Sequence, residues 1–318
     1  MKYAHYLDFS DLSAAEVRSL LARAAARKAE VRAGIRPPHL AGRLLMMIFE
    51  RPSTRTRASF AAAMAQSGGH SFVLDAAGMQ RARGESVADT ARAISSMADA
   101  VMIRAGDHNA LAEFAVHSAC PVINGLSDRS HPCQTLADVM TFQELRGDLR
   151  GRKIAWIGDF NNVLFSWAEA AAMCGAEISA ACPPRYRPPQ PPAAVSWADS
   201  PARAAEDADL VMTDVWASMG DKDAETRRRD FAGYAVDSAL MQRAKKDAVF
   251  MHCLPAHRGE EVAAEVIDGA QSAVWRQAEN RMHAQKALLE LLMAADDGRD
   301  SAKSRTRKFS FGRGGAKK

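Results

Sequence analysis

The stretch "LLMMIFERPSTRTRASF", residues 44–60, passes from an apolar run through a proline turn into hydroxyl and arginine residues. Residues 44–49 are all apolar, as in a parallel strand that is covered on both faces of its sheet. The polar residues follow where a helix is expected to begin, and the free N–H groups and positive dipole end of a helix N-terminus favour an anion. The stretch therefore predicts a strand, a phosphate-binding turn and a helix.

The turn also has a plainer interpretation. Ser53, Thr54 and Thr56 supply hydroxyl donors, and Arg55 supplies a planar guanidinium that matches phosphate oxygens. The same residues would equally make an ordinary helix cap with surface arginines beside it. A nucleotide P-loop is excluded because the pattern GxxxxGK[ST] is absent. The residues of the turn alone leave both interpretations open.

Short apolar runs alternate with helical stretches along the rest of the chain. Strands that are apolar on both faces and alternate with helices indicate parallel sheets covered on both sides. An early helix over 13–33 begins at Ser13, which forms a capping box with Glu16. The further strands are expected at 71–75, 100–104, 121–125, 153–158, 177–182, 209–216 and 248–254.

A polar segment after an expected helix at 132–146 divides the chain. We therefore predict an α/β fold of two similar-sized domains, each a parallel sheet flanked by helices. The first domain covers 1–147 and the second 148–298. The last helix, about 275–295, is expected to fold back on the first domain, and 299–318 is expected to be a basic, disordered tail.

Composition narrows the class of protein. The seven Lys and Arg of residues 301–318 exceed the net charge of +4 of the whole chain, so the rest is mildly acidic and a poor match for a nucleic-acid-binding protein. No apolar run is long enough for a membrane span, and acids stand where a signal peptide needs an apolar stretch. Five scattered cysteines favour reduced thiols. The expected location is the cytoplasm.

Polar residues follow successive strands of the first half, where ligands of parallel sheets bind. Arg104 ends the third strand, His131 lies in the turn before Pro132, and Gln134 follows in the next helix. Taken singly, each is more often a rim or structural residue. Together, and beside the turn at 53–56, they would hold a phosphate and polarise a neighbouring carbonyl group.

The second half presents a different set at its strand ends. Asn162 lies in "GDFNNVLFSW", Asp214, Ser218 and Met219 in "TDVWASMGD", and Cys253 in "FMHCLPAHRGEEV". An acid, amides and a thiol suit a ligand with ammonium and carboxylate groups, such as an amino acid. Alternatively, all three residues have structural roles: Asn162 caps a helix, Asp214 forms a local turn, and Cys253 is a small core residue.

No cofactor or metal is predicted. A dinucleotide site would need GxGxxG after the fifth strand, and only Gly158 is present there. His252, Cys253 and His257 lack the spacing and partners of a zinc site.

Five motifs, "STRTR", "HPCQ", "GDFNNV", "DVWASMG" and "HCLPAHRG", occur in the order and at about the spacing seen in the transcarbamoylases. Over residues 1–295 the chain resembles the ornithine carbamoyltransferase branch of that family. The resemblance implies a homotrimer with active sites between subunits. It also implies transfer of the carbamoyl group of carbamoyl phosphate to the δ-amine of L-ornithine, which gives L-citrulline and phosphate, in arginine biosynthesis or in arginine breakdown. The alternative acceptors are putrescine and an N-acylated ornithine.

The resemblance also implies a role for each matching residue. Arg104, His131, Cys253 and Asp214 would be catalytic. A loop with Gln80 would be lent to the neighbouring subunit, and Phe160 stands where the family commonly has Gly. The residues implied for carbamoyl phosphate are Ser53, Thr54, Arg55, Thr56, Gln80, Arg104, His131, Gln134 and Arg281, and those for ornithine are Asn162, Asp214, Ser218, Met219, Cys253 and Leu254.

Overall fold

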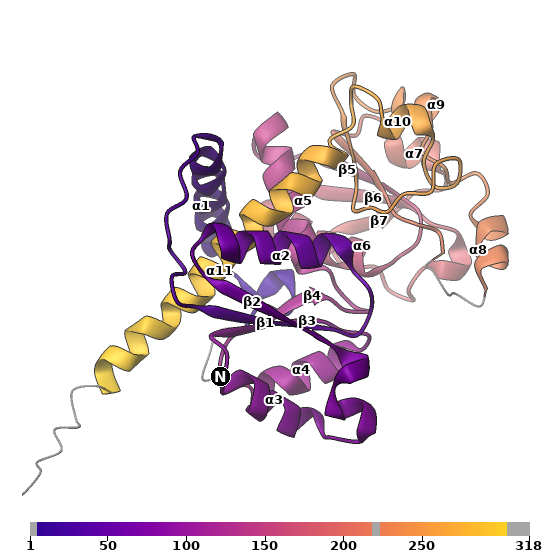
Figure 1. The fold of residues 1–318 in the computed structure, drawn as a ribbon. Helices are drawn as coiled ribbons and strands as arrows, with labels where there is room; N and C mark the ends of the chain where they lie inside the picture. Colours follow the sequence, from indigo (N-terminus) through magenta and orange to yellow (C-terminus); the bar gives the residue numbers. More distant parts are fainter. Residues whose placement is uncertain (1–4, 218–222, 304–318) are drawn as a thin grey trace, which may run out of the picture.

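The computed structural model describes residues 5–217 and 223–303, the last ten of these by their backbone alone. The described chain contains two parallel sheets flanked by helices, as the sequence predicts (Figure 1). The first sheet has the strand order β2-β1-β3-β4. Its strands are β1 (Leu44–Phe49), β2 (His70–Asp75), β3 (Ala100–Arg104) and β4 (Val122–Leu126).

The second sheet has the order β7-β6-β5-β8-β9. One of its strands, β7, was not expected, because its three residues follow a proline-rich segment and form no apolar run. The expected strands at 209–216 and 248–254 are shorter in the structure, since the chain turns at Asp214 and Cys253. The strands are β5 (Lys153–Ile157), β6 (Glu177–Ala181), β7 (Val195–Trp197), β8 (Leu210–Thr213) and β9 (Val249–His252).

Helices connect the strands. Helix α1 begins after Ser13, whose side chain accepts from the Glu16 N–H while the Glu16 carboxylate accepts in return, so the predicted capping box is confirmed. None of the described helices is both long enough and apolar enough to cross a membrane. The helices are α1 (Ala14–Arg32), α2 (Thr54–Gln66), α3 (Val87–Ser95), α4 (His108–His117), α5 (Pro132–Arg146), α6 (Asn162–Cys174), α7 (Pro201–Ala205), α8 (Ala224–Asp230), α9 (Ser238–Met241), α10 (Ala264–Ile267) and α11 (Val274–Lys303).

Strand β1 shows why both faces of the first sheet are covered. Leu45, Met47 and Phe49 pack into the core shared with α2, α5 and α11, whereas Ile48 packs into the core under α3 and α4. Successive side chains of a strand point to opposite faces, so a run that is apolar throughout requires helices on both sides. Figure 1 shows these two helical layers.

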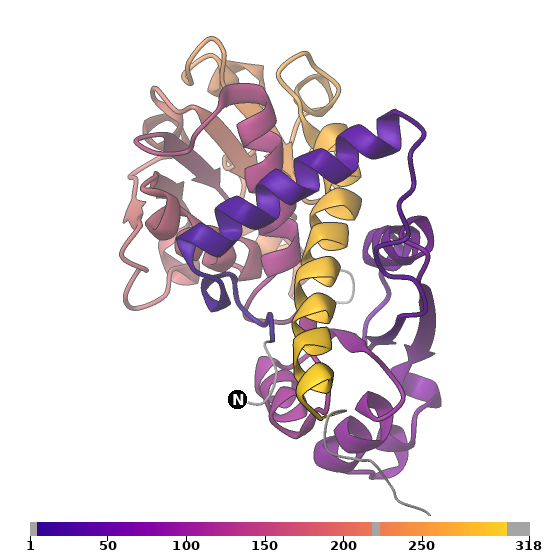
Figure 2. The same ribbon diagram turned by 90° about the vertical axis from the view of Figure 1, so that its left-hand side faces the viewer.

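Helix α11 starts in the second domain and folds back over the first, as predicted. It packs against α1, α2 and α5 (Figure 2). The helix is longer than the expected 275–295 and runs to Lys303. It therefore includes the start of the segment predicted as a disordered tail, because neither Gly nor Pro interrupts residues 299–303. The rest of that segment lies outside the described residues.

A buried lysine ties the three long helices together. Lys28 of α1 is 3% exposed, and its ammonium group lies 2.8 Å from Glu144 Oε2 on α5 and 2.6 Å from Asn280 Oδ1 on α11. Because its partners come from two other helices, the charge is satisfied only when all three are packed.

We expect Lys28→Ala to lower the free energy of unfolding by about 3 kcal/mol, because it breaks a largely buried ion pair and leaves Glu144 and Asn280 without their hydrogen-bond donor. The matched control is Arg32→Ala, which removes a long, exposed contact of 3.7 Å to Glu279 and should cost less than about 0.5 kcal/mol. Urea unfolding of both variants measures the difference. Equal losses would show that Lys28 does not join the helices.

Candidate active site

The candidate site lies where the strand order of each sheet reverses. In the first sheet this is between β1 and β3, and in the second between β5 and β8. Ligands of open parallel sheets bind beyond the carboxyl ends of the strands at such switch points. Ser53 follows β1 and Arg104 ends β3, whereas Asn161 follows β5 and Asp214 follows β8. The topology therefore places both predicted sets of polar residues at ligand-binding edges.

The turn before α2 serves both as a helix cap and as an anchor. Ser53 is the N-cap, and its hydroxyl oxygen accepts from the Thr56 N–H at 3.3 Å. Thr56 is buried, and its Oγ1 accepts from Arg281 Nη2 at 2.8 Å, so α11 reaches the turn directly. Arg57 points away and pairs with Asp75 at 2.7 Å. Ser53 thus caps α2 while its hydroxyl hydrogen stays available to a ligand, and Thr54 is exposed.

Three guanidinium groups gather beside this turn. Arg55, Arg104 and Arg281 have no carboxylate partner among the described residues. The Nε atoms of Arg104 and Arg281 are buried and lack a hydrogen-bond partner within the described chain. Burial, followed by repulsion from Arg281 and Arg55, lowers the pKa of Arg104 to about 10. Burial also lowers the pKa of Arg281.

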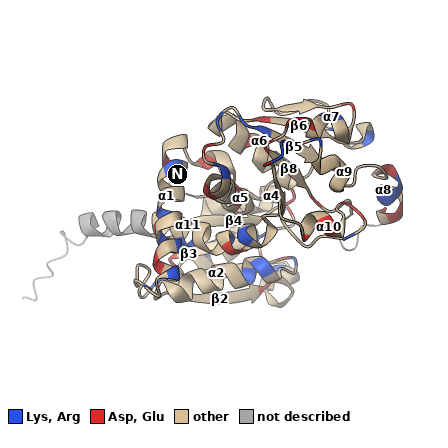
Figure 3. Ribbon diagram, turned by 90° about the horizontal axis from the view of Figure 1, so that it is seen from above, with Lys and Arg blue, Asp and Glu red and all other residues tan. Residues whose placement is uncertain are grey.

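Two other arginines near this turn are paired. Arg57 pairs with Asp75 and Arg81 with Glu50, both at short distances. Figure 3 shows Lys and Arg interspersed with Asp and Glu over both domains. Buried cations without partners destabilise a fold, so a group of them is a site where a ligand supplies the missing negative charge. The three arginines therefore favour binding of a dianion.

His131 lies against the same charges. It is buried, and its Nδ1 lacks a partner within the described chain. Its backbone N–H donates to Ser166 Oγ at 2.8 Å, which fixes the turn before α5 against α6. Burial, together with the positive charges of the arginines, holds the pKa of His131 well below its ordinary value. The imidazole is therefore neutral near pH 7 and interacts with a ligand without adding charge.

Two residues predicted to bind substrate, Gln134 and Gln80, contact other side chains in the structure. The Gln134 amide is already in use, since Oε1 accepts from Arg281 Nη1 and Nε2 donates to Asp138 Oδ1 at 2.7 Å. Gln134 thus holds Arg281 from behind. Gln80 is exposed on the short 3-10 helix Gln80–Arg83, and its described contact is with Arg83, at 3.4 Å. Within one chain, the structure does not bring Gln80 to the arginines.

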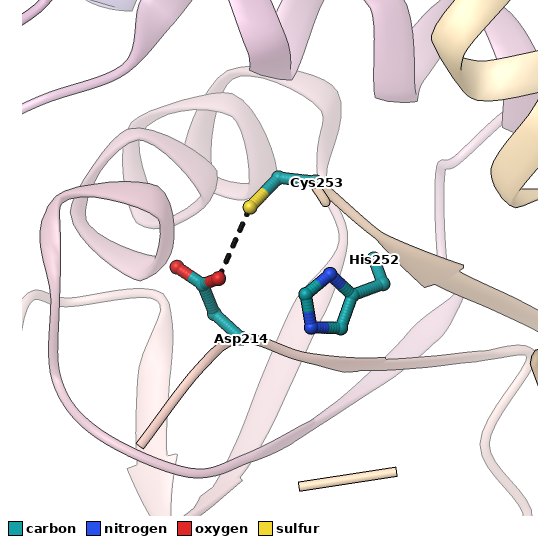
Figure 4. Close-up of side chains that lie close together, drawn as sticks. All are labelled: Asp214, His252 and Cys253. Carbon is teal, nitrogen blue, oxygen red and sulfur yellow. Dashed lines mark hydrogen bonds between the residues drawn. The ribbon is translucent and has the colours of Figure 1, made fainter. Parts of the chain in front are cut away.

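The polar residues at the strand ends of the second domain centre on Asp214. Its Oδ2 accepts from Asn161 Nδ2 at 2.6 Å, and its Oδ1 accepts from Cys253 Sγ at 3.1 Å. Figure 4 shows the thiol directed at the carboxylate. Asn161 is the N-cap of α6, so the alternative in which Asn162 caps that helix is wrong. Asn161 was missed as a site residue because nothing in "NN" tells which amide caps and which faces outward.

Asn162 joins the two domains. Its Nδ2 donates to the carbonyl oxygen of Ser127, beyond β4, at 2.6 Å. Phe160, just before it, packs edge-on against Trp197 with 6.1 Å between ring centroids. The ring therefore has a packing role in the second domain. Ser218 and Met219 lie outside the described residues.

Cys253 is a protonated thiol. Burial, followed by the negative charge of Asp214, raises its pKa well above the ordinary value. The next residue, Leu254, has a φ of +59°, and its N–H donates to His252 Nδ1 at 2.8 Å. One atom each of Asp214, His252 and Cys253 could bind a metal ion, and these atoms lie within 4.8 Å of one another. All three side chains already make hydrogen bonds within the chain, however. The arrangement is a hydrogen-bonded cluster beside the arginines.

Two family descriptions cover most of the chain. Residues 4–144 match "Aspartate/ornithine carbamoyltransferase, carbamoyl-P binding domain", and residues 150–292 match "Aspartate/ornithine carbamoyltransferase, Asp/Orn binding domain". Over 295 residues the sequence is 54% identical to an ornithine carbamoyltransferase of Halorhodospira halophila. The alignment covers 91% of this chain and 98% of the relative.

Solved structures agree with these sequence matches. The ornithine carbamoyltransferase from Pyrococcus furiosus superposes with a TM-score of 0.88 at 45% identity, over 92% of this chain and 98% of that one. The anabolic ornithine carbamoyltransferase from Campylobacter jejuni gives a TM-score of 0.84 at 38% identity, over 92% and 99% of the two chains.

The arginine cluster predicts a ligand-dependent change in stability. Inorganic phosphate at about 100 times its dissociation constant should stabilise the protein by about 2.7 kcal/mol. Arg104→Met should raise the melting temperature of the free protein, because it relieves repulsion, and should lose most of the phosphate effect. Arg57→Ala, the control, should keep that effect. Differential scanning calorimetry with and without phosphate measures both quantities, and full protection of Arg104→Met would contradict the assignment.

Proposed function

The chain belongs to the aspartate/ornithine carbamoyltransferase family, and from this premise we propose that it transfers the carbamoyl group of carbamoyl phosphate to the δ-amine of L-ornithine. The products are L-citrulline and phosphate. The observation that carries the proposal is the group of unpaired arginines facing a carboxylate and thiol cluster across the two domains. Cys253 lies close enough to Arg104 and Arg281 for their charges to act on one another's pKa.

Carbamoyl phosphate would bind at the arginines of the first domain. Its phosphate group would receive hydrogen bonds from the hydroxyl groups and N–H groups of residues 53–56 and from Arg55. Arg281, held by Gln134, would complete the charge balance. The unpartnered Nε atoms of Arg104 and Arg281 support this assignment, because bound phosphate supplies the acceptors that they lack.

The carbamoyl oxygen would lie between Arg104 and His131. Negative charge develops on this oxygen when the amine attacks, and donors that are fixed beforehand stabilise it. A neutral His131 suits this role, since a second full cation would add to the repulsion already present. The protonated state of Cys253 argues against a covalent thiol intermediate. Direct attack of the amine on the carbamoyl carbon is therefore the proposed route.

Ornithine would bind at the second set. Asp214 would bind an ammonium group, and Asn162, whose Nδ2 already donates to Ser127, would offer its amide oxygen. Cys253 and Leu254 would line the place where the substrates meet. The resemblance to the family adds Ser218 and Met219 to the residues that would bind ornithine. The attacking δ-amine must lose a proton, which costs about 4 kcal/mol at pH 7 for an alkyl amine of pKa near 10.4. Removal of water as the site closes would disfavour the ammonium form, so the proton would pass to solvent before closure and leave the neutral amine.

Other amines are weaker candidates. Putrescine lacks the α-carboxylate, and an N-acylated ornithine lacks the free α-amine that Asp214 would bind. The relatives named above are ornithine enzymes, and the structure from Campylobacter jejuni is called anabolic, which supports a role in arginine biosynthesis. A cytoplasmic location is also proposed, and the free thiols of Cys133, Cys174, Cys182 and Cys253 support it.

A substrate panel tests the proposal. Citrulline should form from ornithine at least about 100-fold faster than the matching products form from putrescine, N-acetylornithine or aspartate, because each lacks a group that the site would bind. Asp214→Ala should lose ornithine use, whereas carbamoyl phosphate should still protect it thermally. Preference for another amine would overturn the assignment, and lost protection in the variant would indicate general damage.

We also propose a homotrimer in which a loop of one subunit completes the site of the next. Gln80 is exposed and does not reach the arginines within its own chain. Arg81 pairs with Glu50 at 2.8 Å, which fixes this loop at the edge of the site. Phe72, on the edge strand β2, is 55% exposed, and an apolar ring on a sheet edge favours coverage by another chain.

Mixed trimers would reveal this exchange. Gln80→Ala and Arg55→Ala should each lose about 3 kcal/mol of transition-state stabilisation in a pure trimer. After the two variants are unfolded and refolded together, some sites should combine an intact Gln80 with an intact Arg55 from different chains, so citrulline formation should reappear. Each variant refolded alone is the control. A mixture as inactive as its parents would contradict the shared site.

A further inference from the structure

A buried carboxylate, Asp138 on α5, lies between the two halves of the site. It is 0% exposed. Its Oδ1 accepts from Gln134 Nε2 and from Gln277 Nε2, both at 2.7 Å, and its Oδ2 accepts from Trp167 Nε1 at 3.0 Å. The donors come from three helices, α5, α11 and α6. No role in the proposed chemistry accounts for an acid here.

One arm of this network leads to the phosphate half. Gln134 Oε1 accepts from Arg281 Nη1, and Arg281 Nη2 donates to Thr56 Oγ1 at 2.8 Å. Only two side chains, Gln134 and Arg281, therefore separate Asp138 from the turn before α2. All of these side chains are nearly or fully buried.

The other arm leads to the amino-acid half. Gln277 Oε1 accepts from the backbone N–H of His252 at 3.1 Å. This N–H belongs to the last residue of β9, directly before Cys253. The His252 ring then accepts from the Leu254 N–H at 2.8 Å. The position of the Cys253–Leu254 segment thus depends on Gln277.

The carboxylate decides which way both glutamines face. An ionised carboxylate only accepts hydrogen bonds, so each glutamine must present its NH₂ group to Asp138. The carbonyl oxygen of each then points outward, to Arg281 on one side and to the His252 N–H on the other. Burial raises the pKa of Asp138 to about 6 although three donors oppose it, so the group is still an acceptor near pH 7.

We propose that Asp138 is a positioning residue that orients Arg281 and the end of β9 together, and thereby couples carbamoyl phosphate binding to amino-acid binding. The inference rests on the proposed function. When phosphate draws Arg281 toward it, Gln134 moves or stiffens with it, and Asp138 transmits the change to Gln277. A buried polar network of this kind is rigid only when every member is satisfied.

Calorimetric titration measures the coupling. L-norvaline is ornithine without the δ-amine, so it should bind without reacting. In the wild type, carbamoyl phosphate should tighten norvaline binding by about tenfold or more, within the range usual for coupled sites. In Asp138→Leu, which is close to Asp in shape and removes the acceptor of both glutamines, the tightening should fall below about twofold. Trp167→Phe, the matched control, removes only the Oδ2 bond and should keep the coupling.

A second variant guards against misfolding of Asp138→Leu. Gln277→Met keeps the volume but breaks only the arm to β9, so carbamoyl phosphate affinity should stay within about twofold of wild type while the coupling is lost. Unchanged coupling in Gln277→Met, equal loss in Trp167→Phe, or no coupling in the wild type would overturn the inference. Failure of the proposed function is distinct, since it would appear as a wild type that makes no citrulline.

Discussion

The repulsion among three guanidinium groups, held together without a carboxylate partner, is the constraint on which the described site depends. Arg55, Arg104 and Arg281 come from α2, β3 and α11, which are far apart in the chain. A fold gains nothing by collecting cations in a buried place, so their presence indicates that function sets these positions. The rest of the architecture holds the arginines in place, where a bound dianion would neutralise them.

The two domains contribute unequally to this arrangement. The first supplies the turn before α2 and most of the positive charge, whereas the second supplies Asp214, Cys253 and the amide at Asn162. Helix α11 connects them, because it begins beside β9 and carries Arg281 back to Thr56. One helix therefore contacts both places where substrates would bind. Lys28 and its partners on α5 and α11 keep that helix in register with the first domain.

The sequence predicts the architecture well because its signals are local. Residues 44–49 are apolar at every position, and that pattern fits only a strand covered on both faces. Strand β7 escaped notice because three residues make no period. Helix α11 was expected to stop early because the Gly, Ser and Lys content of the final segment is typical of a disordered tail. The motifs follow the strand ends, which is why the sequence places both predicted sets of polar residues at the edges of the sheets.

What the sequence did not reveal depends on contacts between distant residues. Which of Asn161 and Asn162 caps α6 is decided by the position of Asp214, more than fifty residues away. Gln134 reads as a substrate ligand, but its amide holds Arg281 from behind. Asp138 gave no signal, since an acid inside an apolar helix face becomes meaningful only when its three donors are seen.

A crystal structure of the protein soaked with carbamoyl phosphate tests the central claim most directly. The account predicts the phosphate group at the N-terminus of α2, within hydrogen-bond distance of Arg55 and of the unpartnered Nε atoms of Arg104 and Arg281. Density for the ligand elsewhere, with the three arginines still unpaired, would contradict it.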